Sequence, residues 1–309
     1  GGPAAPLRTL PLFPLPAVAL PAGRGQLRVF EPRYLRLFDR VQADSGDPQG
    51  VGGLFGHILH VDAAPDGLLD EQLAGRAGPS LRVGCAARVT AVERAGDGEL
   101  RVDYEGHRRF VVRGLQGAGE GGDDEGGFNL AAVEWLLDVE EDTIPAVEAG
   151  NQAYADKVEA GLYNYVSEIC RLQAMLDGLG GRVELPAAVR RFAPPRAAGS
   201  GRRGASSRGL RHQRDMATWR KASGLTEGKR PPSDPYGLVG ARDGLGKDLR
   251  RELFSFACLA SLVERDVAQD SVLLRSRSTL SRLEWTVSAL EPHLERLRVE
   301  ARMTGAIGR

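Results

Sequence analysis

Residue types that often carry catalysis or bind metals occur in this chain, but their spacing argues against a reactive centre. His57 and His60 are three residues apart on an expected strand, so their side chains point to opposite faces and cannot share a metal ion. Cys85, Cys170 and Cys258 are widely separated and form no C-x-x-C pair, so we expect neither a zinc site nor a disulfide framework. No G-x-S-x-G elbow and no S-x-x-K pair is present. We therefore expect no catalytic residue, no metal site and no cofactor.

A glycine-rich stretch matches the pattern of a nucleotide-binding loop without its context. Gly117, Gly119 and Gly122 follow G-x-G-x-x-G, and the acidic Asp123 and Asp124 come directly after them. A phosphate group at such a loop is held by the N–H groups of a following helix, and carboxylates repel it. No helical pattern follows here, so we expect no nucleotide site.

Charge is unevenly distributed, although 41 basic and 41 acidic residues give no net charge. Residues 1–181 carry 16 basic and 27 acidic side chains, whereas residues 182–230 carry 13 basic and 3 acidic ones. The basic excess includes five arginines within a segment rich in Gly, Ser and Pro: Arg202, Arg203, Arg208, Arg211 and Arg214. Such a segment can track the phosphates of a nucleic acid, contact an acidic partner or the acidic part of this chain, or stay solvated. The sequence leaves these alternatives open.

The expected secondary structure differs between the first and second halves of the chain. Up to about residue 140, strand patterns occur at 10–15, 26–31, 52–61, 81–93, 100–112 and 128–139. Pro32 opens an early helix whose apolar stripe contains Tyr34, Leu35, Phe38 and Val41. We expect an α+β fold in which residues 1–142 form a small mixed β-barrel with one early helix.

From Ile144 the apolar period becomes helical. One seam runs through Tyr154, Val158, Leu162, Tyr165, Ile169, Leu172 and Leu176, and a last one through Leu280, Leu283, Val287, Leu290, Leu294 and Leu297. Pro292 falls inside the last seam, so we expect a kink or a new helix start there. We expect a helical extension at 143–194, a basic flexible linker at 195–235 and a C-terminal helical region at 236–309. The C-terminal helices are candidates for oligomerisation or complex assembly.

Ordered motifs in the barrel region resemble the substrate-binding domain of the Lon protease family. They read L-P-L-F-P-L-P from Leu10, L-R-V-F-E-P-R-Y from Leu27, F-G at Phe55, V-G-C-A-A-R-V from Val83, E-G-H-R-R-F from Glu105 and A-V-E-W-L from Ala132. The resemblance implies a PUA-like barrel. Six large apolar side chains suit the core of such a barrel, namely Phe13, Phe30, Tyr34, Phe38, Phe55 and Phe110. Gly84 and Gly106 suit bulges or tight corners.

The resemblance also implies a function without catalysis. Lon proteases continue into an AAA+ ATPase module and a Ser-Lys peptidase domain, and this chain has neither, so we expect no enzyme. The chain is more similar to the stand-alone LON-domain proteins of bacteria, cyanobacteria and plastids, and Leu253-Phe254-Ser255-Phe256 looks like the plastid version. We expect a protein-binding module that recognises substrates or acts as an adaptor in protein quality control or complex assembly. Val18 and Leu20, expected to be exposed after the first strand, are the candidate contacts.

Two further expectations concern partners and location. Because PUA-like barrels elsewhere bind RNA, an RNA-binding role through the basic linker is the alternative function. No run approaches the roughly 18 consecutive apolar residues of a transmembrane helix, so we expect no membrane span. A start at Gly1-Gly2, three free cysteines and the plastid-like tail favour the chloroplast stroma, and otherwise the cytoplasm.

Overall fold

The computed structural model describes residues 7–47, 50–60, 83–96, 98–116, 127–136, 138, 145–178, 184–194 and 247–306. The elements below belong to a compact unit formed by residues 1–193 together with 248–309. The linker expected at 195–235 lies outside the described residues, and the proposed boundaries at 142, 194 and 235 stay predictions.

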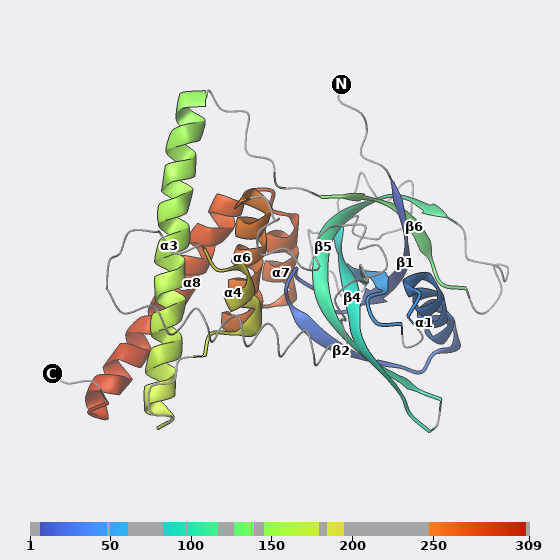
Figure 1. Cartoon of the computed structure of the whole chain (residues 1–309), viewed down its shortest axis with the longest axis horizontal. Coiled ribbons are helices and arrows are strands. Elements are labelled where there is room, and N and C mark those ends of the chain that lie inside the picture. Colours follow the sequence, from blue (N-terminus) through green and yellow to red (C-terminus); the bar gives the residue numbers. More distant parts are fainter. Residues whose placement is uncertain are drawn as a thin grey trace, which may run out of the picture. The chain divides into compact units, whose positions relative to one another are not determined.

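One mixed sheet of six strands forms the first part of the fold (Figure 1). The strands are β1 (Arg8–Leu15), β2 (Arg24–Val29), β3 (Leu54–Leu59), β4 (Val83–Arg94), β5 (Leu100–Gln116) and β6 (Leu130–Trp135). Their order is β2-β5-β4-β3-β1-β6, and β6 also pairs with β5. This second pairing closes the sheet, because the long β5 reaches from β2 at one end to β6 at the other. Only β1 and β3 pair in parallel among these strands. The expected mixed barrel is confirmed.

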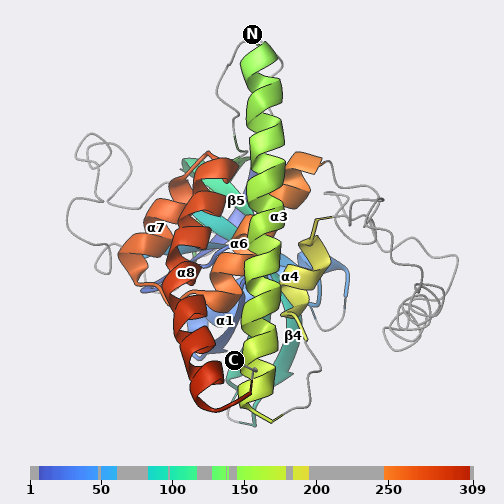
Figure 2. The same cartoon turned by 90° about the vertical axis from the view of Figure 1, so that its left-hand side faces the viewer.

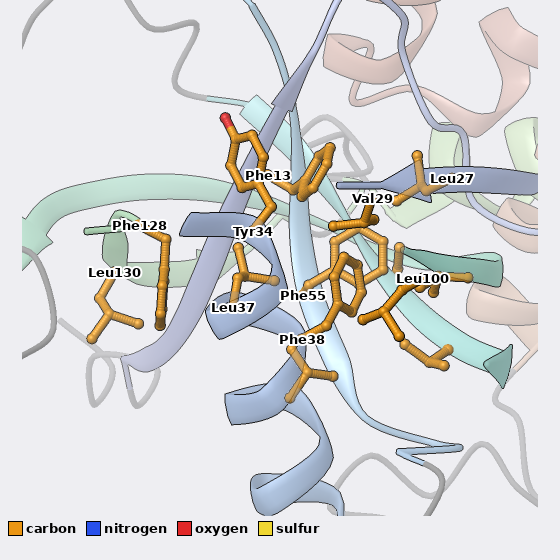
Figure 3. Packing of buried hydrophobic residues seen from close by; sticks show 14 residues of the cluster. Phe13, Leu27, Val29, Tyr34, Leu37, Phe38, Phe55, Leu100, Phe128 and Leu130 are labelled. Atoms are coloured by element: carbon orange, nitrogen blue, oxygen red, sulfur yellow. The ribbon is translucent and has the colours of Figure 1, made fainter. Parts of the chain in front are cut away.

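Aromatic and aliphatic side chains together fill the barrel interior (Figure 3). The rings of Phe13 and Tyr34 lie 4.3 Å apart between centroids, and those of Phe38 and Phe55 lie 5.3 Å apart. Five of the six large side chains expected in the core are buried. Phe30 is the exception, because β2 ends at Val29 and the Phe30 side chain is 66% exposed.

The early helix, α1 (Pro32–Ser45), begins at the expected residue. Proline suits its first turn because the missing N–H has no helical partner there. The helix ends where Gly46 takes the left-handed conformation, with φ of 68°. Its buried face contains Tyr34, Leu37, Phe38 and Val41, and the expected Leu35 is partly buried against the same core.

The second part of the unit is helical. Its helices are α3 (Pro145–Leu176), α4 (Ala187–Phe192), α6 (Lys247–Leu262), α7 (Val267–Arg275) and α8 (Thr279–Met303). The long helices α3 and α8 lie side by side (Figures 1 and 2). They run parallel, since Tyr154 interacts with Glu284 and Glu168 binds Arg298 further along both helices. None of the helices in the described ranges is long and apolar enough to cross a bilayer.

Two details of the long helices differ from the expected seams. The buried face of α3 contains Ala155, Leu162, Val166 and Ile169, while Tyr154 is 47% exposed. The helix itself is as predicted. The side of the helix that faces the core differs in part from the expected seam that begins at Tyr154. Helix α8 continues through Pro292, so a new helix start there is wrong.

A buried cluster of charged side chains joins the barrel to the helices. Arg109 of β5 donates hydrogen bonds to Asp138, which follows β6, and to Glu252 of α6, with 2.8 Å from Nη2 to Oε1 of Glu252. Arg282 of α8 also donates to Asp138, with 3.1 Å from Nη1 to Oδ1. Both guanidinium groups lie over the ring of Phe256, at 5.2 Å and 4.3 Å from its centroid. One polar network therefore contacts β5, α6 and α8 together.

The two carboxylates of this cluster have opposite pKa shifts. Burial pushes the pKa of Asp138 upward, but the hydrogen bonds and charge of Arg282, together with the charge of Arg109, outweigh it and hold the pKa below its usual range. Burial, and then the neighbouring Asp138, raise the pKa of Glu252. The charges of Arg109 and Arg282 and the hydrogen bond from Arg109 act in the opposite direction on Glu252.

We expect Arg109→Met to lower the free energy of unfolding by about 3–5 kcal/mol, because it removes the guanidinium that pairs with the buried Glu252 and with Asp138. The matched control is Arg113→Met on the same strand, since Arg113 pairs with Glu134 while 51% exposed. That change should cost less than about 1 kcal/mol. Urea unfolding followed by circular dichroism measures both, and equal costs would contradict a clamping role for Arg109.

Candidate functional site

A groove of about 160 Å³ opens between α1 and the hairpin of β4 and β5. We call it the α1–β4 groove, and its lining residues are Phe38, Val41, Gln42, Gly50, Val89, Val92, Arg94 and Leu100. Five of these side chains are apolar, and Gln42 and Arg94 supply polar groups. The volume is comparable to that of a cavity of about 150 Å³ that binds benzene. The groove therefore has room for one large apolar side chain of a ligand.

The chain between α1 and β3 passes close beneath the helix and shapes one wall of the groove. A Cβ atom at Gly53 would lie 2.5 Å from Cγ1 of Val41, so only glycine fits there. Gly50 has a φ of 75°, in the left-handed region that favours glycine. These glycines allow the backbone to approach α1 without filling the groove.

The opposite wall is the outer half of β4, where the strand alternation is interrupted. The register against β5 shifts between Val89 and Ala91, which marks a β-bulge. Thr90 and Ala91 are both exposed, whereas Val92 is half-buried and faces the groove. The bulge thus turns Val92 toward α1.

An exposed ion pair connects the two walls of the groove. Nη2 of Arg94 lies 3.5 Å from Oδ1 of Asp39 on α1, and the two side chains are 57% and 59% exposed. Exposed pairs of this kind contribute about 0–1 kcal/mol. A ligand can therefore displace this pair at low cost.

The two expected contact residues occupy a different surface. Leu20 is only 3% exposed, so the expectation that it is accessible is wrong. It packs with Phe256 and Leu259 of α6, and Val18 packs at the edge of the same cluster. The loop is held close to the barrel, since the Ala22 N–H donates to the Gly106 carbonyl at 2.7 Å. The helices therefore cover this loop, and binding by the half-buried Val18 stays a prediction.

The other residues singled out from the sequence form no second site. Arg202, Arg203, Arg208, Arg211 and Arg214 lie outside the described residues, as do the acidic glycine-rich residues 117–126. His57 is buried in β3 and His60 is exposed just beyond it. Within the described ranges, no group of three His, Cys, Asp or Glu side chains is placed to hold a metal ion.

A small cavity beside His57 is too small for a ligand. Its volume is about 10 Å³, the size of one water molecule, and Val18 and Ser271 also line it. Burial lowers the pKa of His57 to about 4, so the imidazole is neutral at physiological pH. Burial also raises the pKa of the adjacent Cys85 thiol to about 12, which leaves it unreactive.

Comparison with known protein families shows to which family this barrel belongs. Residues 9–186 match the family model described as the ATP-dependent protease La (LON) substrate-binding domain. The match covers more than half of the chain. This chain belongs to the LON substrate-binding domain family. The match extends through β1–β6 and α3, so the α1–β4 groove lies wholly within the LON domain.

Two solved structures resemble this LON-domain chain. One is a Lon N-terminal domain protein from Xanthomonas campestris, with 19% identity and a TM-score of 0.43, covering 91% of this chain and 98% of that one. The other is the N-terminal domain of the Mycobacterium avium complex Lon protease, with 12% identity and a TM-score of 0.43, covering 93% and 100%. No curated protein matches the sequence.

The groove of this LON domain was not foreseen from the sequence, although two signals for it are present. After Val89 the next large apolar residue of the strand is Val92, and this step of three is consistent with a bulge. Phe38 and Val41 were expected in the helix stripe, but as core residues only. What the sequence lacks is the distance between α1 and β4, which depends on packing between segments far apart in the chain.

The buried His57 of the LON barrel predicts a pH dependence of stability. Its pKa in the folded state is about 4, below the usual 6.5, so its contribution to stability is present above pH 6.5 and is lost as the pH falls toward 4. As the pH falls from 6.5 toward 4, we expect the free energy of unfolding of the unaltered protein to decrease more steeply than that of His57→Gln. The difference in slope should be about 1.4 kcal/mol per pH unit. Urea unfolding at several pH values measures the difference. His60→Gln, at an exposed position, is the control, and identical slopes for His57→Gln and the unaltered protein would contradict the prediction.

Proposed function

We propose that this LON-domain chain recognises segments of polypeptide through the α1–β4 groove, as a substrate-recognition or adaptor module. Membership of the substrate-binding family supports recognition of a polypeptide. The groove supports it further, because its apolar walls would bury a hydrophobic side chain that an unfolded segment exposes. The single observation that carries the choice of surface is this groove, since the other candidate loop is covered by α6 and α7.

The absence of catalysis is part of the same proposal. The family match is to a substrate-binding domain, which supports a binding role rather than catalysis. Action in protein quality control or complex assembly, a PUA-like relationship of the barrel, and location in the chloroplast stroma remain predictions. Assembly through α3 and α8 is also proposed, and native mass measurement tests it.

Substitution in the groove tests the proposed function. We expect Val92→Glu to weaken binding of fluorescein-labelled, reduced and carboxymethylated lysozyme at least about tenfold, because the carboxylate is placed among apolar side chains. Val272→Glu makes the same substitution at a 60% exposed position on α7, outside the groove lining and β4, and should change the affinity by less than about threefold. Fluorescence anisotropy measures both after circular dichroism has confirmed folding. If the unaltered chain does not bind this unfolded polypeptide, the proposed function is wrong, and equal effects of the two substitutions would exclude the groove.

RNA binding is distinguished by its response to salt. If the basic segment binds RNA, affinity for a single-stranded RNA oligomer should fall steeply between 50 and 200 mM salt, as counterion release requires. It should also be lost when Arg202, Arg203, Arg208, Arg211 and Arg214 are changed to Gln. We expect instead that this fivefold variant keeps its affinity for the unfolded polypeptide. Loss of polypeptide binding in the variant would move the site to the arginines.

A further inference from the structure

The outer half of β4 has an open edge beside the α1–β4 groove. Strand β4 pairs with β5 as far as Arg94 of β4. It pairs with β3 on its other side only as far as Arg88. Val89 is the last residue bonded on the β3 side, where its N–H donates to Gly53 at 3.0 Å and its carbonyl accepts from Gly52 at 2.9 Å. Among the described residues, 90–94 therefore have a neighbouring strand on the β5 side alone.

Open edges attract other strands, and β2 shows one way in which this sheet protects them. β2 ends the strand order, and its Arg24 and Arg28 side chains are 72% and 74% exposed. Such charges are a common protection against pairing with another chain. On β4, the first three residues of the open edge are Thr90, Ala91 and Val92, which carry no charge. Charged residues return at Glu93 and Arg94, so the uncharged part of this edge is the part that includes Val92 of the groove.

The dimensions of edge and groove fit one kind of occupant. Five edge residues extend over about 17 Å at roughly 3.4 Å per residue, which is the length of a short added strand. Alternate side chains of such a strand point to the same face. The groove volume of about 160 Å³ accommodates one large side chain from that face. A helical ligand satisfies its own backbone groups and would leave the edge of β4 unused.

We infer that the polypeptide binds in extended form as an additional strand on residues 90–94 of β4, with one aromatic or large aliphatic side chain in the α1–β4 groove. This inference rests on the proposed function and specifies its ligand. Backbone hydrogen bonds to the edge would supply affinity independent of sequence, and the groove would select for a single large apolar residue. The exposed Arg94–Asp39 pair would open to admit the strand.

The test uses peptides that differ only in backbone hydrogen-bond donors. The parent is an acetylated, amidated nonapeptide of alternating Ser and Thr with a central Phe, and it competes with the labelled unfolded lysozyme. Two isomers each carry four N-methyl groups on alternate residues, one isomer at positions 2, 4, 6 and 8 and the other at positions 3, 5, 7 and 9. Because alternate N–H groups of a strand point to opposite edges, only one isomer loses the donors that face β4.

We expect one isomer to bind at least about tenfold more weakly than the parent and the other within about threefold of it. The parent should also lose affinity for Val92→Glu but not for Val272→Glu on α7. Equal binding by both isomers and the parent, or equal loss in both isomers, would overturn strand addition while leaving polypeptide binding intact. Failure of the parent to compete, when the unfolded lysozyme still binds, would overturn the inference as well. Failure of the lysozyme to bind would instead contradict the proposed function.

Discussion

The burial of two guanidinium groups is the constraint on which the arrangement of this protein depends. Arg109 and Arg282 are each about 1% exposed, and a buried cation is tolerated only with charged and hydrogen-bonding partners. Those partners are Asp138 after β6 and Glu252 of α6, so segments more than 100 residues apart must meet. The barrel and the helices therefore form a single unit rather than two independent layers, and the ring of Phe256 between the two cations completes the junction.

This junction also determines which surfaces remain available for a partner. The loop that carries Leu20 is used to pack the barrel against α6 and α7, and it is removed from solvent. The α1–β4 groove involves neither of these helices, because its walls come from α1, the following loop and the hairpin of β4 and β5. A ligand can enter the groove without disturbing the Arg109 cluster, so recognition and structural integrity depend on different residues.

Local patterns in the sequence predicted most helices and strands. The features that they did not predict, such as the groove, depend on packing between distant segments. The strands, α1, α3 and α8 follow clear apolar periods, whereas α7 has only the capping box of Asp266 and Gln269 as a signal. Phe30 was expected inside because of its type, but β2 ends one residue before it. The groove was missed because it arises where a bulge in one segment approaches a helix from another. No pattern within either segment encodes that distance.

Hydrogen exchange measured with and without the unfolded polypeptide tests binding at the α1–β4 groove, because it locates the bound segment without altering the protein. Binding there predicts slower exchange for the amides of residues 90–94 of β4 and for Phe38–Gln42 of α1, with little change at Ala19–Ala22 beneath α6 and α7. Slower exchange at Ala19–Ala22 or in the basic segment at 202–214, with β4 unchanged, would contradict it.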